Sequence, residues 1–207
     1  MKPSPLQLGV LVSGSGTNLQ SILDAALEGR INVDVRVVIS NRKDAGALER
    51  ARRAGVPAVV ISHKQYDNRE SFEEALIQAL RQHDVEWVAL AGFMRVLTSH
   101  FLHAFPQRVV NIHPALLPSF PGVHAQRQAL EYGVKFSGCT VHFVDEGTDT
   151  GPIIGQAVVP VLDSDDEESL TAKILEQEHR LFSSVLQLLA EGRIVRDGRR
   201  VKILGPH

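Results

Sequence analysis

Cysteine is almost absent from the sequence, since Cys139 is the only one in 207 residues. A single thiol excludes an internal disulfide and a zinc site built from several cysteines. We therefore expect Cys139 to be a small buried apolar residue and not a nucleophile. Without such crosslinks the fold must be stabilised by packing, and a chain of this length can bury a sizeable core.

An excess of basic residues is also missing. The chain has 22 lysines and arginines against 24 acidic residues, which gives a net charge of −2. Proteins that bind nucleic acid usually carry a basic excess or a basic stripe, so no nucleic-acid partner is expected. The short cluster of Arg50, Arg52 and Arg53 is interpreted as a solvated helix face.

Long apolar runs are the third absence. No stretch approaches the length of a membrane span. The first apolar stretch is interrupted by Gly14 and is too short for the core of a secretion signal. The composition therefore predicts a cytoplasmic protein with no membrane contact. Either a monomer or a homodimer is expected.

What the sequence does contain is a regular alternation of apolar strands and amphipathic helices. This order predicts βαβ units around a parallel sheet, and the strands show little polar alternation, as in a sheet covered on both faces. Strands are predicted at 6–13, 33–40, 58–61, 87–91 and 108–112, and helices at 18–28, 45–54, 69–83 and 98–104.

The rhythm changes after residue 122. A helix is predicted at 126–132, paired strands at 137–144 and 153–161, a long helix at 166–191, and a hairpin around the Asp197-Gly198 turn. The expected fold class is α/β, with a doubly wound, mostly parallel central sheet, helices on both faces and an antiparallel C-terminal addition. One domain is expected over residues 1–207.

The first strand runs into the glycine-rich turn SGSGTNLQ, residues 13–20, and then a helix. Such a turn lets backbone N–H groups converge on an anion at a helix N-terminus. A dinucleotide fingerprint needs a third glycine, where this chain has Leu19, and an acidic residue after the second strand, where it has Asn41. A single phosphate group is therefore predicted, and the plainer alternative is a tight turn capped by Thr17 or Asn18. The candidate phosphate-binding residues are Gly14, Ser15, Gly16, Thr17 and Asn18.

A second polar group follows the strand at 108–112 in the stretch NIHPALLPSFPG. Asn111 and His113 are two positions apart, so they point to the same side if the strand geometry continues. An amide donor suits a developing oxyanion, and an imidazole moves protons near neutral pH. Three prolines stiffen the loop that follows. The plainer alternative is that both side chains only satisfy backbone groups in a turn.

An acidic loop, DEGTDTGP, follows the strand that carries His142. Asp145, Glu146 and Asp149 compete for a role there, although acidic loop residues are most often solvated turn formers. His113, His124, His142 and an aspartate are the candidates for a metal site, but their spacings match no standard ligand pattern. No metal is predicted.

Taken together, SGSGTNLQ, LAGFMRVL, NIHPALLPSFPG, HFVDEGTDTGPII and the QEH that ends at His179 resemble the phosphoribosylglycinamide formyltransferases, a family of folate-dependent enzymes. The resemblance covers about residues 6–204. It implies transfer of a formyl group from the cosubstrate 10-formyltetrahydrofolate to the amino group of 5-phosphoribosylglycinamide in purine biosynthesis. It further implies a phosphate-binding half, about 1–105, and a folate-binding and catalytic half, about 106–207.

The resemblance also implies roles for single residues. Asn111, His113 and Asp149 match the catalytic positions, Gly16, Thr17 and Asn18 match the phosphate loop, and Glu178 matches a position near the ribose hydroxyls. Positions that contact the folate are matched by Arg69, Met94, Arg95, Val96, Leu97 and Asn111. The chain departs from some relatives at Leu175, where they carry a polar or basic residue, and at Thr150, where they carry glycine.

On this interpretation Asn111 and a protonated His113 stabilise the tetrahedral oxyanion, and His113 then protonates the leaving nitrogen. A nearby Asp149 is expected to raise the pKa of His113. Two enzyme alternatives remain: another 10-formyltetrahydrofolate-dependent formyltransferase, acting on methionyl-tRNA or an amino sugar and normally carrying a further domain, or a formyltetrahydrofolate hydrolase. A non-catalytic nucleotide-binding module would bind phosphate without binding folate.

Overall fold

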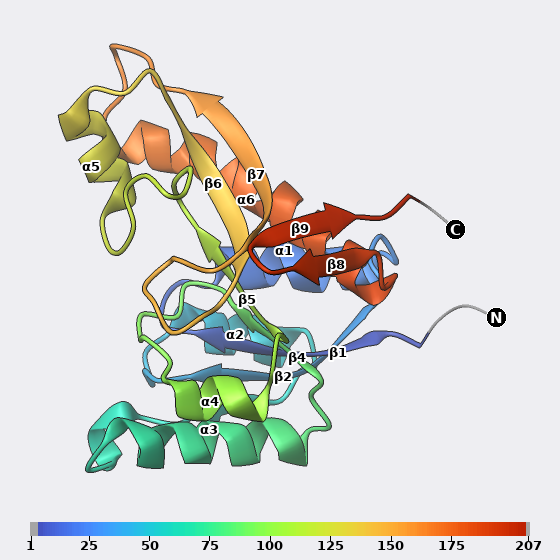
Figure 1. The fold of residues 1–207 in the computed structure, drawn as a ribbon. Helices are drawn as coiled ribbons and strands as arrows, with labels where there is room; N and C mark the ends of the chain where they lie inside the picture. The colour runs from blue at the N-terminus through green and yellow to red at the C-terminus, as the bar shows by residue number, and fades with distance from the viewer. Residues whose placement is uncertain (1–3, 206–207) are drawn as a thin grey trace.

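A computed structural model describes residues 4–205 and places seven strands in one sheet, in the order β3-β2-β1-β4-β5-β6-β7 (Figure 1). Strands β1 to β5 run parallel, whereas β6 and β7 are antiparallel additions at one side. A separate antiparallel pair, β8 and β9, forms the predicted hairpin. The strands are β1 Leu6–Val12, β2 Val33–Ser40, β3 Ala58–Val60, β4 Trp87–Leu90, β5 Val109–His113, β6 Phe136–Phe143, β7 Ile153–Pro160, β8 Ile194–Asp197 and β9 Arg200–Ile203.

The helices also follow the prediction, with ends shifted by at most one residue. They are α1 Thr17–Leu27, α2 Gly46–Arg53, α3 Arg69–Gln82, α4 Ser99–Ala104, α5 Ala125–Tyr132 and α6 Glu167–Ala190. A short 3₁₀ turn, η1 His63–Gln65, was not predicted. Helix α6 begins with a capping box between Asp166 and Ser169, which explains its sharp start after a run of acidic residues. The doubly wound α/β class is thus confirmed.

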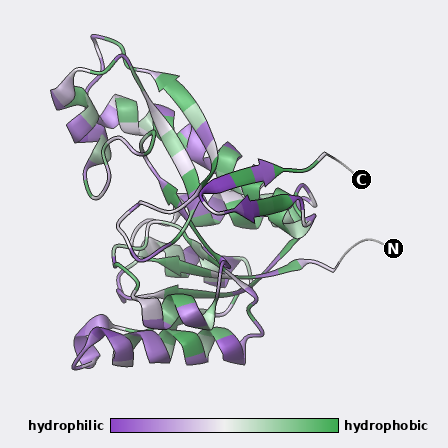
Figure 2. Cartoon of the chain, in the orientation of Figure 1, coloured by the Kyte–Doolittle hydropathy of each residue, from purple (hydrophilic) through white to green (hydrophobic). Residues whose placement is uncertain are grey.

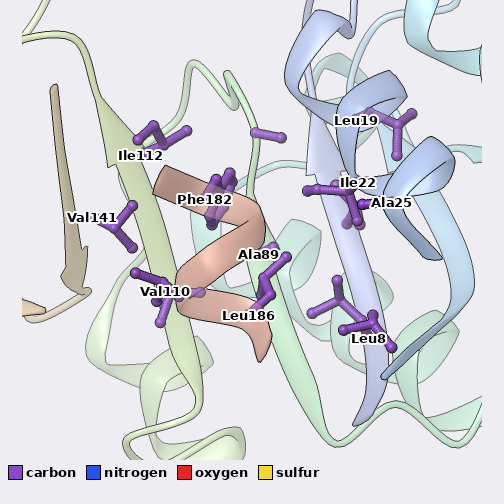
Figure 3. Packing of buried hydrophobic residues seen from close by; sticks show 14 of the residues in the cluster. Leu8, Leu19, Ile22, Ala25, Ala89, Val110, Ile112, Val141, Phe182 and Leu186 are labelled. Atoms are coloured by element: carbon purple, nitrogen blue, oxygen red, sulfur yellow. The ribbon is translucent and has the colours of Figure 1, made fainter. Parts of the chain in front are cut away.

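Helices cover both faces of the sheet because two apolar clusters lie against it. On one face α1 and α6 pack on the strands, and Figure 3 shows Phe182 and Leu186 of α6 beside Val110 of β5. On the other face α3 and α4 contribute a cluster that includes Leu76 and Phe101. Figure 2 shows mostly hydrophobic residues along the central strands and many hydrophilic ones along α3. This two-sided burial accounts for the continuous apolar runs in the strands.

Cys139 lies in the first of these clusters, with none of its surface exposed. Burial, together with the charge of Glu178, raises the pKa of its thiol to about 12. The thiolate that a nucleophile requires is therefore not populated near neutral pH. The interpretation of Cys139 as a buried apolar residue is confirmed.

The sheet has its topological switch point between β1 and β4. From β1 the chain continues outward through β2 and β3, whereas β4 leads to β5 on the opposite side. Ligands of doubly wound folds bind at such a point, beyond the carboxyl ends of the strands. The glycine-rich turn after β1 and the segment after β4 meet there, since the N–H of Ser13 donates to the carbonyl of Gly92 at 3.0 Å.

The described ends of the chain lie on the other side of the molecule. The chain enters β1 and leaves β9 at the right of Figure 1, whereas the loops at the carboxyl ends of the parallel strands lie at the left. Within residues 4–205 no helix combines the length and the apolar content that crossing a membrane requires.

Candidate active site

The end of β5 places Asn111 and His113 on one side of the sheet, as their spacing predicted. Strand β5 lies between β4 and antiparallel β6, and His113 is buried whereas Asn111 is partly exposed. Both approach the same carboxylate, that of Asp149. The distances are 3.4 Å from Asn111 Nδ2 to Asp149 Oδ1 and 3.4 Å from His113 Nδ1 to Asp149 Oδ2.

Asp149 belongs to the loop between β6 and β7 and adopts a left-handed backbone conformation, with φ of 54°. Its carboxylate also accepts a hydrogen bond from the backbone N–H of Gly122 at 2.8 Å. Gly122 ends the proline-rich loop after β5, so this bond joins the two loops that flank the site. Of the three acidic residues in the loop, Asp149 is the one that reaches the imidazole.

Asp145 has a different place in the same loop. Its Oδ1 accepts hydrogen bonds from the hydroxyl of Thr150 at 2.6 Å and from the N–H of Gly147 at 3.2 Å. These contacts tie the loop to itself immediately before and after Asp149. Thr150, one of the departures from the family pattern, thus supplies a contact within the loop.

The ring of His113 is buried, and both of its nitrogens face acceptors. Nε2 lies 2.8 Å from the carbonyl oxygen of Phe120, which can only accept, so this nitrogen carries a proton. Nδ1 faces the carboxylate of Asp149. A second proton, giving the imidazolium, would therefore lie directly against a negative charge.

His142 is the functional candidate that sequence reasoning missed as a partner of Asn111. Strand register pairs it with Asn111 across β5 and β6, and its Nε2 lies 3.2 Å from Asn111 Nδ2 and 3.6 Å from Asp149 Oδ1. Its Nδ1 lies 2.8 Å from the carbonyl of Phe143. Nδ1 thus donates to that carbonyl, and Nε2 accepts from the Asn111 amide. The only sequence signal was its position in the strand before the acidic loop.

For His113 and Asp149, the direction of one pKa shift differs from the expectation based on sequence. Burial lowers the pKa of His113 below its ordinary value and outweighs the opposing effects of Asp149 and of the Phe120 carbonyl. The expectation of a raised pKa is therefore wrong for the protein without ligands, although Asp149 does act in the expected direction. Burial opposes the charge of Asp149 too, but the nearby His142 side chain, the hydrogen bond from the N–H of Gly122 and the neighbouring His113 hold its pKa below the ordinary range. Asp149 is ionised at neutral pH.

The glycine-rich turn is a bare helix N-terminus. Gly16 is the N-cap of α1 with φ of 78°, and neither a side-chain cap nor an acidic residue occupies the first turn. The alternative in which Thr17 or Asn18 caps the helix is thus wrong. A Cβ atom at Gly16 would lie 2.5 Å from the Cβ of Ala47, because α2 packs tightly on the turn. The partial positive charge of the helix end is left for an anion.

The interpretation of Arg50, Arg52 and Arg53 as a solvated helix face is wrong for Arg50. Its Nε donates to the carbonyl of Ser15 at 2.8 Å and its Nη1 to the side chain of Gln20 at 3.2 Å. A guanidinium is thus attached to the glycine-rich turn. The expectation holds for Arg52 and Arg53, which are exposed and pair with Glu49.

Helix α6 reaches the same turn through Glu178, whose buried carboxylate accepts a hydrogen bond from Asn18 Nδ2 at 3.0 Å. Burial raises the pKa of Glu178 above its ordinary value, although the Asn18 bond acts in the opposite direction. Residues 160 positions apart are thereby brought together beside the glycine-rich turn. Leu175, one turn earlier in α6, is half-buried.

The segment after β4, residues 94–97, forms an exposed and largely apolar surface at the switch point, called the ledge below. Met94 and Val96 are 67% and 48% exposed, which is unusual for such side chains, whereas Leu97 is buried. Arg95 is half-buried, and Arg69 is exposed at the start of α3. Within the described part of the chain no hydrogen bond or ion pair joins Arg69 to the cluster around Asp149. Among the same residues no group of three or more His, Cys, Asp or Glu side chains is placed to hold a metal ion.

Comparison with known proteins shows which family the chain resembles. The model of the formyl transferase family matches residues 6–186. The chain is 43% identical to the phosphoribosylglycinamide formyltransferase of Escherichia coli over 91% of this chain and 89% of that protein. It superimposes on the crystal structure of glycinamide ribonucleotide transformylase 1 from Symbiobacterium toebii with a TM-score of 0.96 and 56% identity, covering 98% and 95% of the two chains.

Longer relatives contain the same module. The chain is 50% identical to part of the trifunctional purine biosynthetic protein adenosine-3 of Drosophila melanogaster, covering 90% of this chain but 14% of the length of that protein. The match to the family model covers most of the chain and includes every element that contributes to the cluster around Asp149. The chain belongs to the formyl transferase family.

Proposed function

We propose that this protein transfers the formyl group of 10-formyltetrahydrofolate to the amino group of 5-phosphoribosylglycinamide, giving the formylated ribonucleotide and tetrahydrofolate in purine biosynthesis. The observation that carries the proposal is the convergence of an amide, an imidazole and an ionised carboxylate at the carboxyl end of β5, on the same edge of the sheet as an uncapped helix N-terminus. The relatives named above support the choice of substrates.

Attack of the amine on the formyl carbon creates a tetrahedral centre with a negative oxygen, which Asn111 is placed to stabilise. Its two amide protons point to His142 at 3.2 Å and to Asp149 at 3.4 Å. The longer contact is the weaker one, and the developing oxyanion takes over that N–H. A preorganised donor of this kind contributes about 3–4 kcal/mol to transition-state stabilisation.

His113 supplies the proton that N10 of the folate needs to leave. To reach the substrate, its Nε2 gives up the hydrogen bond to the Phe120 carbonyl. The imidazole is mostly neutral before the reaction, because burial lowers its pKa. A developing oxyanion adds a second negative charge beside Asp149, so His113 takes up the proton that the attacking amine loses and becomes an imidazolium. The imidazolium then gives a proton to N10 as the bond between N10 and the formyl carbon breaks.

The two substrates are assigned to different segments at this edge of the sheet. The phosphate of the ribonucleotide binds at Gly14, Ser15, Gly16, Thr17 and Asn18, with the ribose toward Glu178. The pteridine ring of the folate lies on the ledge formed by Met94, Arg95, Val96 and Leu97, and Arg69 faces its tail. The exposed apolar surface of Met94 and Val96 supports this placement, since flat heteroaromatic ligands bind mainly through apolar walls. We place the reaction in the cytoplasm.

The decisive experiment is a formyl-transfer assay with purified protein, 10-formyltetrahydrofolate and the ribonucleotide. Release of tetrahydrofolate together with the formylated ribonucleotide is expected. Formate release that does not depend on the ribonucleotide would instead indicate a hydrolase. Phosphate binding without any folate binding would indicate a non-catalytic module.

Removing the phosphate from the substrate is expected to lower kcat/KM at least about a hundredfold, because hydrogen bonds to a charged group contribute about 1.5–3 kcal/mol each. The comparison is made between 5-phosphoribosylglycinamide and the corresponding riboside under the same folate concentration. Equal kcat/KM values for the two would contradict the assignment of the turn after β1.

Gly16→Ala tests the turn from the side of the protein. Alanine is strained at φ of 78°, and its Cβ would collide with Ala47, so the turn has to move away from α2. We expect the KM for the ribonucleotide to rise about tenfold or more, since the loss of a single charged contact has that size, while folate affinity changes little. Gly29→Ala is the matched control, because Gly29 has φ of 69° with no atom near its Cβ position. It should lower the Tm without changing either KM.

A further inference from the structure

Ser13, the first residue after β1, makes three hydrogen bonds at the switch point. Its hydroxyl donates to Oδ1 of Asn41 at 2.7 Å and accepts the backbone N–H of Met94 at 2.9 Å. Its own N–H donates to the carbonyl of Gly92 at 3.0 Å. The residue is 4% exposed, so these bonds are shielded from water.

Asn41 extends this set of contacts to a third strand end. It follows β2, is 5% exposed, and its Nδ2 lies 3.4 Å from Nδ1 of His63 in η1. The ends of β2, β1 and β4, which are adjacent in the sheet, are therefore joined by one buried polar relay. Ser13 is its centre, because among residues 4–205 it alone forms hydrogen bonds both to Asn41 and to the segment after β4.

The relay lies between the two candidate binding regions and contacts the start of each. Gly14, the next residue along the chain, begins the turn assigned to phosphate, and Met94 begins the ledge assigned to folate. Met94 is exposed through its side chain, whereas its backbone N–H is held by the Ser13 hydroxyl. A side chain that must lie against a ligand is thus anchored through its own backbone.

We propose that Ser13 is a positioning residue that fixes the position of the ledge, residues 94–97, relative to the phosphate-binding turn. The amine and the formyl carbon then meet in the reactive geometry. The proposal rests on the proposed function for the identity of the two ligands. Displacement of one ligand by a fraction of a bond length has a large effect on rate, because transfer depends on close approach of the reacting atoms. Asn41 orients the Ser13 hydroxyl by accepting its proton.

Ser13→Ala is the primary test, with Ser40→Ala as the matched control. Ser40 is fully buried at the end of β2, and its hydroxyl contacts only the backbone of Arg42 among the described residues. Both variants lose one buried hydroxyl and both should lower the Tm. In Ser13→Ala alone we expect the Kd for 10-formyltetrahydrofolate to rise about tenfold, the size of one lost buried hydrogen bond, and the Met94 amide to lose protection from hydrogen exchange.

Ser13→Thr keeps the hydroxyl and should restore folate affinity to within about twofold, well inside the effect of one hydrogen bond. Asn41→Ala, should Ser13→Ala fail to fold, is expected to weaken folate binding in the same direction, whereas Asn41→Asp retains the acceptor and should not. The proposal is overturned if Ser13→Ala loses stability like Ser40→Ala but binds folate as the wild type does. Binding and exchange are measured without turnover, so a failure of the formyl-transfer assay would count against the proposed function and not against the role of Ser13.

Discussion

Asp149→Asn is expected to lower kcat by about two to four orders of magnitude, the range contributed by a positioned acid–base group. The substitution keeps the shape of the side chain and the acceptor for the N–H of Gly122, but it removes the negative charge that faces His113 at 3.4 Å. Folate and ribonucleotide affinity should change far less than kcat.

The pH dependence of the same variant shows whether the charge of Asp149 raises or lowers the pKa of His113. In the wild-type protein burial lowers the pKa of His113, and the charge of Asp149 opposes that effect. Removing the charge leaves burial less opposed, so the pKa of His113 falls further. The alkaline limb of kcat/KM should therefore move to lower pH, and the imidazole resonances of His113 should titrate at lower pH in NMR spectra of the free protein.

Two further variants complete this test. His113→Asn should remove the histidine-dependent limb, and the double variant should be little slower than the slower single variant, because groups that act as a unit have non-additive effects. An Asp149→Asn protein with wild-type kcat and an unchanged pH profile would exclude Asp149 from the mechanism. It would also leave the strained backbone of Asp149 without a functional reason.

Asn111→Asp is expected to lower kcat by about two to three orders of magnitude, the cost of losing an oxyanion donor. The new carboxylate would lie near Asp149, which Asn111 Nδ2 approaches to 3.4 Å, and it would also face the forming oxyanion. The measurement is kcat under saturating substrates, together with the Kd for a folate analogue.

Asn111→Ala separates the two causes in this experiment. It removes the donor without adding a charge, so it should lose most of the same activity, and any further loss in Asn111→Asp reports repulsion. Wild-type kcat in the alanine variant would show that Asn111 does not stabilise the oxyanion. His113, whose Nε2 carries a proton, would then be the donor to examine.

The sequence predicted the fold well because its signals are local. Strand lengths, helical spacing and the Asp197-Gly198 turn depend on neighbouring residues, and all the predicted elements are present. The resemblance to phosphoribosylglycinamide formyltransferases, which rested on five motifs, is confirmed by the comparisons. The spacing of two in a strand predicted that Asn111 and His113 point to the same side, and the family pattern placed Asp149 near His113.

The features that escaped prediction depend on packing between distant segments. The pairing of Asn111 with His142 is set by the register of β5 against β6, and the contact of Arg50 with Ser15 by the packing of α2 on the turn. The lowered pKa of His113 is set by burial, which periodicity cannot quantify. Ser13 and Asn41 were noticed only as residues beside a motif, although they join three strand ends.

The separation between the described chain ends and the catalytic loops has a consequence for how this domain can be combined with others. Both ends lie on the amino side of the sheet, and the substrates are assigned to the carboxyl side (Figure 1). A polypeptide joined at either end would extend away from the proposed binding regions for folate and ribonucleotide. The module is thus suited to genetic fusion without occlusion, and its relatives include a trifunctional protein in which the matching region makes up 14% of the length.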